Sequence, residues 1–185
     1  MLFRDTGLPW VFPSPNMPTP ETALVYPGQV IWEGTNVSEG RGTTLPFELV
    51  GSPFWEHEPI LDALSRTPLP GCYFRPLVFE PTSGKWAGQH CTGFQIHVTD
   101  KHSFLPYRTS IALLQAVLDL YPEEFQYKSP PYEYEYERLP MDLILGSQKV
   151  RRRLEEKIDI LEIEGEWEEA LKVFKREREK YFLYQ

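Results

Sequence analysis

Apolar residues form three short runs in the first 100 residues of this 185-residue chain. At 29–33, 71–80 and 92–99 they are rich in β-branched and aromatic side chains and are bounded by glycine, proline or polar residues. Such runs are typical of strands buried in a sheet. We therefore expect a small mixed sheet built from these three segments.

Between the expected strands, apolar residues recur at helical spacing. A short helix is expected from about Thr19 to Tyr26, with Gly28 ending it. A second helix begins near Glu56 and stops before Pro68, because proline cannot continue a helix. These helices would flank the sheet.

The clearest helical pattern in the first part of the chain is at 109–122. Thr109 or Ser110 can cap this helix, and Pro122 ends it. The later stretch PPYEYEYER alternates tyrosine with glutamate. It is either an edge strand or an ordered loop.

Proline divides the chain into two parts. All 18 prolines lie within the first 140 residues. From Met141 onward we expect helices, one capped by Ser147 and a last one from about Gly165. One face of that last helix is apolar and consists of Trp167, Leu171, Phe174 and Tyr181. These patterns predict one domain of the α+β class, with a proline-rich portion at 1–140 and C-terminal helices at 141–185 packed on it.

The opening stretch TGLPWVFPSPNMPTPETALVYPG combines closely spaced prolines with bulky apolar residues. Its proline content alone is typical of a linker. Trp10, Val11, Phe12 and Met17 are interleaved with the prolines, and a solvated linker rarely carries such side chains. We interpret this stretch as an ordered, extended segment packed over a surface.

Charge and composition exclude several classes of function. The net charge of −8 argues against nucleic acid or an anionic membrane as the main partner. No apolar run approaches the roughly 20 residues of a membrane helix. No secretion signal is visible, so a cytoplasmic location is favoured. The two cysteines form neither a disulfide framework nor a zinc motif, and no metal or cofactor is expected.

The stretch EGTNVSEGRGTT, at 33–44, follows the first expected strand and is called the polar loop here. Its three glycines allow close approach of the backbone, and its side chains offer carboxylates, a guanidinium group, an amide and hydroxyls. A strand that runs into a glycine-rich loop often carries a site. The alternative is a tight loop whose polar groups satisfy its own turns. It matches neither a phosphate-binding loop nor a dinucleotide fingerprint.

Carboxylates and one histidine are the candidate reactive groups. Glycoside cleavage usually employs two carboxylates, and Glu33, Glu39 and Glu48 lie in or beside the polar loop. Each of them can instead pair with Arg41 or act as a cap. His97 lies in the strand-like stretch FQIHVTD, where a structural role competes with a functional one.

Four stretches resemble one family over essentially the whole chain. They are the proline-rich opening, EGTNVSEGRGTTLPFELVGSPF, GKWAGQHCTGFQIHVTD and the terminal REKYFLY. Together they resemble the C-terminal half of the exo-β-N-acetylmuramidase family, the NamZ or YbbC-like proteins. Two positions depart from the family's pattern. Phe12 stands where proline is expected, and Lys85-Trp86 replaces the usual Lys-His pair, so the role of that histidine position is in doubt.

The resemblance implies a glycosidase that removes N-acetylmuramic acid from the non-reducing ends of peptidoglycan fragments. It also implies a Rossmann-like N-terminal half, with the active site in the cleft between the two halves. We expect that half to be supplied in cis, if this chain is a fragment, or as a separate subunit. The proline-rich opening would cover the surface that meets it. Without it, we predict that this chain is inactive or nearly so.

The family's substrate suggests roles for individual side chains. Glu39 and Glu33 are the candidate catalytic residues, and Arg41 would pair with the lactyl carboxylate of muramic acid. The remaining candidates for substrate binding are Asn16, Asn36, Thr43, Thr44, Glu48 and His97.

Two other functions stay open. One is a non-catalytic module that binds sugar or assists assembly, with Trp32, Trp55 or Trp86 stacking on a sugar face. The other is a different hydrolase on the same scaffold. The pattern of residues determines neither the stereochemistry of cleavage nor the oligomeric state.

Overall fold

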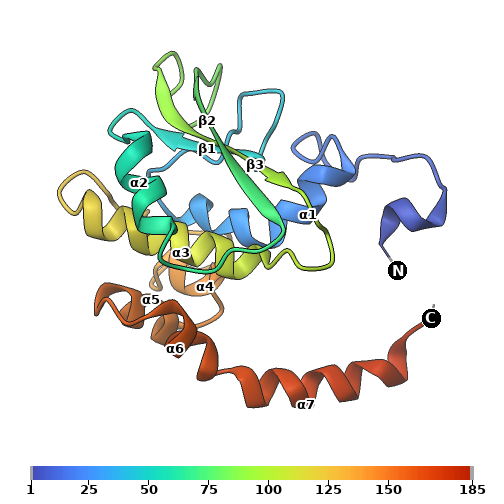
Figure 1. Cartoon of the computed structure of the whole chain (residues 1–185). Coiled ribbons are helices and arrows are strands. Elements are labelled where there is room, and N and C mark those ends of the chain that lie inside the picture. Colours follow the sequence, from blue (N-terminus) through green and yellow to red (C-terminus); the bar gives the residue numbers. More distant parts are fainter. Residues whose placement is uncertain (1, 184–185) are drawn as a thin grey trace.

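The protein consists of a three-stranded sheet stacked on two successive layers of helices (Figure 1). The computed structural model describes residues 2–183. The sheet has the order β1-β3-β2, and both pairings are antiparallel. Its strands are β1 (Leu49–Ser52), β2 (Cys72–Phe79) and β3 (Cys91–Val98).

Helices account for most of the regular structure. The α-helices are α1 (Pro20–Gln29), α2 (His57–Leu64), α3 (Pro106–Leu120), α4 (Pro140–Ile144), α5 (Gln148–Glu155), α6 (Ile160–Gly165) and α7 (Glu168–Arg178). Three 3-10 helices complete the set: η1 (Phe3–Thr6), η2 (Val30–Gly34) and η3 (Glu179–Tyr181). The expected α+β class is confirmed, but the sheet is antiparallel and not mixed.

The strand expected at 29–33 is wrong. Gln29 is the last residue of α1, and η2 continues the helical path, with the Val30 N–H donating to the Tyr26 carbonyl. The helical turn buries both Ile31 and Trp32, as a strand would. A short apolar run is therefore compatible with either a buried strand or a buried helix. The third strand is β1 instead, and it is only four residues long.

Gly28 does not end α1, as the sequence suggested, but lies inside it. A Cβ atom at this position would come within 2.0 Å of the Pro106 carbonyl oxygen. The glycine therefore lets α1 approach the start of α3. Helix α3 itself begins three residues before the expected cap, since Pro106 occupies its first turn and Ser110 is buried within the helix.

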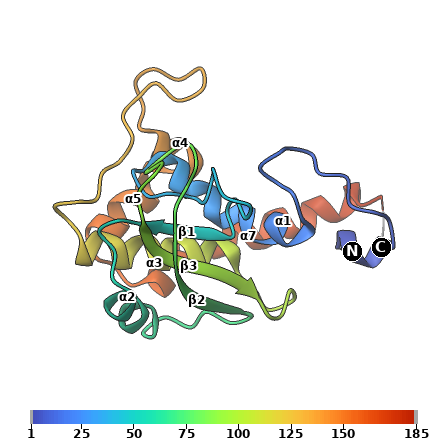
Figure 2. The ribbon, with the colours of Figure 1, turned by 90° about the horizontal axis from the view of Figure 1, so that it is seen from above.

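The other predicted elements are close to those observed. Strands β2 and β3 pair over their whole length, and α2 begins directly after Glu56. Ser147 caps α5 as expected, because its hydroxyl accepts a hydrogen bond of 3.1 Å from the Lys149 N–H. The PPYEYEYER stretch is a loop that projects from the body between α3 and α4 (Figure 2).

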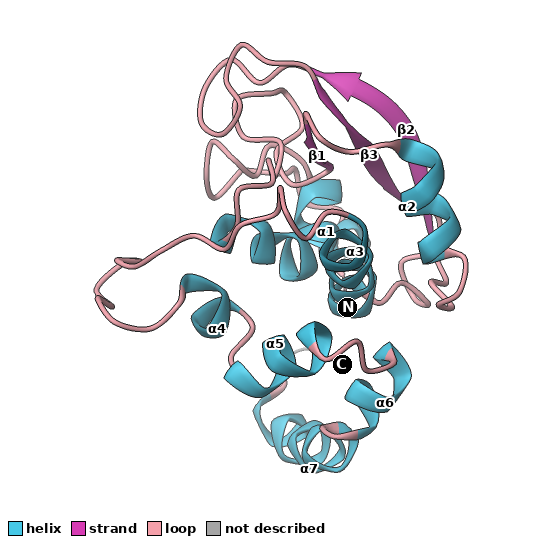
Figure 3. Ribbon diagram, turned by 90° about the vertical axis from the view of Figure 1, so that its left-hand side faces the viewer, coloured by secondary structure: helices cyan, strands magenta, loops and turns pink. Residues whose placement is uncertain are grey.

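The C-terminal helices differ in how much they contribute to the core. Helix α4 packs against η2, while α5 and α6 pack against α3 (Figure 3). Their residues Leu154, Ile160 and Ile163 belong to the same buried cluster as Phe94 of the sheet. Helix α7 has no buried residue. Within residues 2–183, no helix combines the length and apolar character needed to cross a membrane.

Candidate functional site: an ion-pair network at the polar loop

The first half of the polar loop is anchored to the body by two backbone bridges. An isolated bridge pairs Thr35 with Tyr127, and another pairs Ser38 with Gly51 of β1. Glu33, the first residue of the loop, lies on η2. The loop therefore presents its side chains from a fixed backbone.

A second loop, at 80–90, packs directly on the polar loop. The Thr82 N–H donates a 2.8 Å hydrogen bond to the Gly42 carbonyl. Gly42 has a φ of 82°, and a Cβ atom there would lie 2.4 Å from the Ser83 carbonyl oxygen. Glycine is required at this position both by its backbone conformation and by the close approach.

Lys85 of this second loop inserts its ammonium group beneath the polar loop. Its Nζ atom donates to the Trp32 carbonyl at 2.6 Å, to the Val37 carbonyl at 2.9 Å and to Glu39 Oε2 at 2.7 Å. An ammonium group has three protons to donate, so all three are satisfied. Next to it, the Trp86 indole donates to the Asn36 carbonyl.

Arg41 links the two candidate catalytic carboxylates. Its Nη2 atom donates to Glu33 Oε1 at 2.5 Å, and its Nε lies 3.3 Å from Glu39 Oε1. The guanidinium lies over the ring of Phe47, 5.3 Å from the ring centre. Phe47 has a φ of 63°, a conformation that costs a non-glycine residue about 1–3 kcal/mol. Its fully buried ring holds it there.

Glu33 has one further partner, from the projecting loop. The Tyr132 hydroxyl donates a 2.9 Å hydrogen bond to Glu33 Oε2. Both oxygens of Glu33 and both oxygens of Glu39 thus face a donor or a cation.

Burial and charge shift the pKa values of three groups in the network. Burial lowers the pKa of Lys85, and the charge of Glu39 offsets part of that shift. Burial also acts to lower the pKa of Arg41, but the hydrogen bond and charge of Glu33 outweigh it and raise the net value. Burial, followed by the hydrogen bond to Glu33, raises the pKa of Tyr132.

The remaining candidates of the polar loop are mostly engaged in local structure. The Asn36 side chain donates to the Glu124 carbonyl and accepts from the Gln126 N–H. The Thr43 hydroxyl donates to the Gly40 carbonyl, so it stabilises a turn. Thr44 is exposed.

Glu48 is buried away from the network. Its Oε1 accepts hydrogen bonds from the hydroxyls of Thr19 and Thr22 at 3.1 Å and 2.8 Å, at the start of α1. This contact joins the opening segment to the residue that precedes β1. It is a structural role at the start of α1, which the sequence offered as the alternative to substrate binding.

Asn16 and His97 lie outside the ion-pair network. Asn16 is in the opening segment, where its backbone N–H donates to the Ser14 hydroxyl. His97 is on β3 opposite Tyr73, and its Nε2 atom is buried without a hydrogen-bond partner in the described part of the chain. Trp32 and Trp55 belong to the core, which excludes them as stacking platforms for a sugar.

Lys85 and Tyr132 were not among the candidate residues, yet both contact the candidate carboxylates. Lys85 lies in the GKWAG stretch that carries the family resemblance, which is the one signal that pointed to it. Tyr132 is separated from Glu33 by 99 residues, and no local pattern indicates their contact. No group of three or more metal-ligating side chains is present within residues 2–183.

The fold and network define an α+β domain with a carboxylate–guanidinium pair at a glycine-rich loop. The chain belongs to the family described as exo-β-N-acetylmuramidase NamZ, C-terminal, which it matches over residues 24–184. This finding confirms the resemblance noted from the sequence.

Relatives and solved structures place the chain within a longer type of protein. It is 40% identical to the peptidoglycan β-N-acetylmuramidase NamZ of Bacillus subtilis (strain 168) over 184 residues, which span all of this chain and 42% of that protein. A crystal structure of a DUF1343 family protein from Bacteroides fragilis has a TM-score of 0.83 at 28% identity, over 100% of this chain and 48% of that one. A second protein of that family and organism has a TM-score of 0.64 at 24% identity, over 94% and 43%. The chain thus spans less than half the length of these relatives.

Proposed function

We propose that this chain forms one wall of the substrate cleft of an exo-β-N-acetylmuramidase. In this proposal the longer protein hydrolyses the bond to a terminal N-acetylmuramic acid of peptidoglycan fragments. Membership of the family and the activity named for the B. subtilis relative support it. The single observation that carries it is the geometry of Arg41.

Arg41 is held rigidly and still has a donor edge to offer. Its side chain is 40% exposed, although Glu33, Glu39 and the Phe47 ring restrain it. Its Nη1 atom has no hydrogen-bond partner among the described residues. A planar guanidinium with a free edge suits a carboxylate ligand. The lactyl carboxylate is the group that distinguishes muramic acid from glucosamine, so Arg41 would select for it.

Of the two candidate catalytic carboxylates, Glu33 is the better placed to face a sugar. Glu39 is only 5% exposed and lies between Lys85 and Arg41, so we assign it the positioning of those two cations. Glu33 would stabilise positive charge that develops at the sugar ring. Thr44 would bind a sugar hydroxyl, while Asn36, Thr43 and Glu48 shape the loop.

A glycosidase also needs a proton donor for the leaving group. Because every oxygen of Glu33 and Glu39 already faces a donor or a cation, we assign this acid to the other half of the longer protein. We propose that half to be Rossmann-like, present in cis or as a separate subunit. Positioning by a complete cleft supplies roughly 7–11 kcal/mol of a barrier, so this chain alone is expected to be inactive.

The proposal is tested by Arg41→Lys in the chain combined with its N-terminal half. Lysine keeps the charge but loses the planar donor edge. Hydrolysis of a chromogenic β-N-acetylmuramide should fall at least tenfold, and hydrolysis of the matching glucosaminide should change little. Arg138→Lys, in an exposed arginine of the projecting loop, is the matched control. Equal losses on both substrates would contradict the assignment.

The non-catalytic alternative predicts a different result for this chain alone. A sugar-binding module would retain muropeptide fragments without any partner. Titration of the purified chain with a muropeptide, followed by calorimetry, separates the two. Tight binding without hydrolysis, unchanged when the N-terminal half is added, would favour the binding module.

A further inference from the structure

The two ends of the chain form an apolar surface on one side of the molecule. In Figures 1 and 2, η1 and the end of α7 lie on that same side. We call this surface the terminal face. It consists of Phe3, Leu24, Leu105, Leu171, Phe174 and Tyr181.

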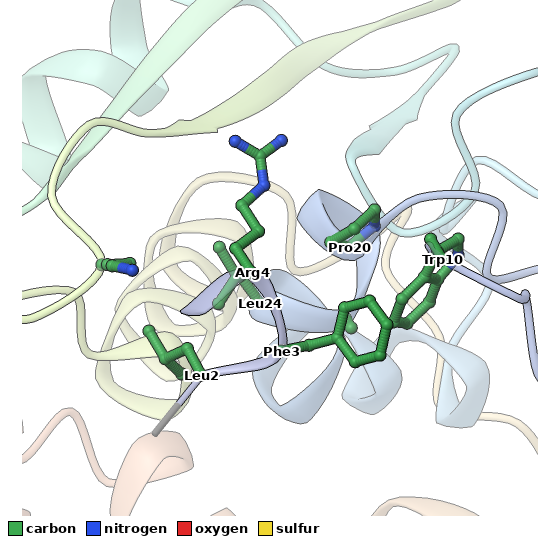
Figure 4. Close-up of a pocket in the computed structure, with 8 residues that line it drawn as sticks. Leu2, Phe3, Arg4, Trp10, Pro20 and Leu24 are labelled. Carbon is green, nitrogen blue, oxygen red and sulfur yellow. The ribbon is translucent and has the colours of Figure 1, made fainter. Parts of the chain in front are cut away.

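The first part of the terminal face is a cavity of about 150 Å³ between η1 and α1. Leu2, Phe3, Trp10 and Leu24 supply most of its lining (Figure 4). Its charged members are the cations Arg4 and Lys101, and Lys101 also holds Asp5 of η1 at 2.6 Å. Arg4 in turn pairs with Glu21, so the cavity is apolar with ion pairs at its edge.

The second part is the apolar stripe predicted for the last helix. At about 100° per residue, Trp167, Leu171, Phe174 and Tyr181 share one face of the helical path. The last three are 40%, 59% and 81% exposed. Leu171 and Trp167 line a groove of about 430 Å³ together with Leu105, which precedes α3. The stripe therefore faces the same side as the start of α3, which follows the loop that carries Lys101.

Helix α7 needs a partner to be stable. It has 11 residues, none of them buried. Isolated helices shorter than about 12–15 residues are marginal in water, and most helical stability in proteins comes from packing an apolar face. Contiguous exposed apolar surface of this kind is typical of an interaction site.

The family relationship indicates what covers this surface. Less than half of the B. subtilis relative is matched by this chain, so the remaining 58% of that protein is available to pack against it. At about 100° per residue, the C-terminal part of the stripe is bordered by Lys175 on one side and by Glu177 on the other. The complementary surface is therefore mainly apolar, with charges of both signs at its edges.

We propose that the terminal face docks the N-terminal half of the longer family protein, with the α7 stripe as its main contact. This inference rests on the proposed function, since both require that half. It adds the site of docking, which lies at the ends of the chain and not at the polar loop. Docking there would hold the two walls of the cleft in a fixed relation.

The test measures association and hydrolysis separately. The unmatched part of the B. subtilis relative is co-produced with this chain, and Kd is determined by sedimentation. Leu171→Glu and Phe174→Glu should each weaken association at least tenfold. Val173→Glu is the matched control, because Val173 is exposed to a similar degree but lies off the stripe. The same variants are made in one joined chain, where hydrogen exchange of α7 should be slowed only when the stripe is intact.

Each outcome decides one of the two proposals. If the halves associate through the stripe but cleave no muramide, docking stands and the proposed function fails. If the joined protein cleaves muramide while both stripe variants bind normally, docking at this face is overturned. Unprotected α7 amides in the joined chain overturn it as well. So does a dimer of this chain alone that Phe174→Glu dissociates, since a second copy then covers the stripe.

Discussion

The polar loop and the terminal face treat their functional groups in opposite ways. At the polar loop, four charged side chains from two loops and η2 satisfy one another almost completely. At the terminal face, aromatic and aliphatic side chains of η1 and α7 remain in contact with water. The charges of the first region are paired within this chain, whereas the apolar side chains of the second are exposed.

The difference shows which groups of a domain find their partners within one chain and which can be left exposed. A buried charge must find its counter-charge during folding, since an unpaired one costs several kcal/mol. An exposed apolar side chain carries a much smaller penalty and can wait for a partner. A surface that awaits a partner is therefore expected to be apolar, whereas buried charged groups are expected to be paired within the chain.

Removing Lys85 should destabilise the protein more than the other changes at the polar loop. Lys85→Ala leaves Glu39 buried with Arg41 as its one cation and leaves the Val37 carbonyl without its donor, while the Trp32 carbonyl still accepts from Thr35. We expect a loss of about 3 kcal/mol in the free energy of unfolding, at the low end for a broken buried pair. Urea denaturation measures it. Lys175→Ala on the exposed α7 is the control and should change stability by less than about 0.5 kcal/mol. Similar losses in both variants would show that the network contributes little.

A pair of glycines separates backbone strain from close packing at the same loop. Gly42 and Gly84 have nearly equal φ values of 82° and 80°, but only Gly42 has backbone atoms against it. Gly84→Ala should cost about 1 kcal/mol for its left-handed conformation. Gly42→Ala should cost about 2 kcal/mol or more, because its methyl group also meets Ser83. Thermal unfolding of both variants is the measurement. Equal costs would mean that the second loop moves aside freely.

The smallest effect is expected on the terminal face. Phe174→Ala should change the stability of this chain by less than about 0.5 kcal/mol, because the ring has few contacts. Ile163→Ala, in the neighbouring helix α6 and fully buried, should cost about 2–4 kcal/mol. A loss above about 1 kcal/mol for Phe174→Ala would show that the stripe is already covered in this chain.

Much of the fold followed from local pattern. Strands β2 and β3, helix α2 and the Ser147 cap were expected close to their observed positions, because each is specified by neighbouring residues. The strand at 29–33 was not found, because a run such as Val30-Ile31-Trp32 satisfies a buried strand and a buried helical turn equally well. Packing of η2 against α4 and its continuation from α1 decided between them.

The candidate site, like the fold, could be predicted only in part. Sequence alone identified the family and the polar loop, and it offered pairing with Arg41 as the alternative to a catalytic role for the carboxylates, since these residues lie within a dozen positions of one another. Only the tertiary structure decided that Lys85 neutralises Glu39 from below and that Tyr132 reaches Glu33. Contacts between distant segments depend on how the loops fold over one another. The residues of one segment do not identify the distant segment that will pack on it.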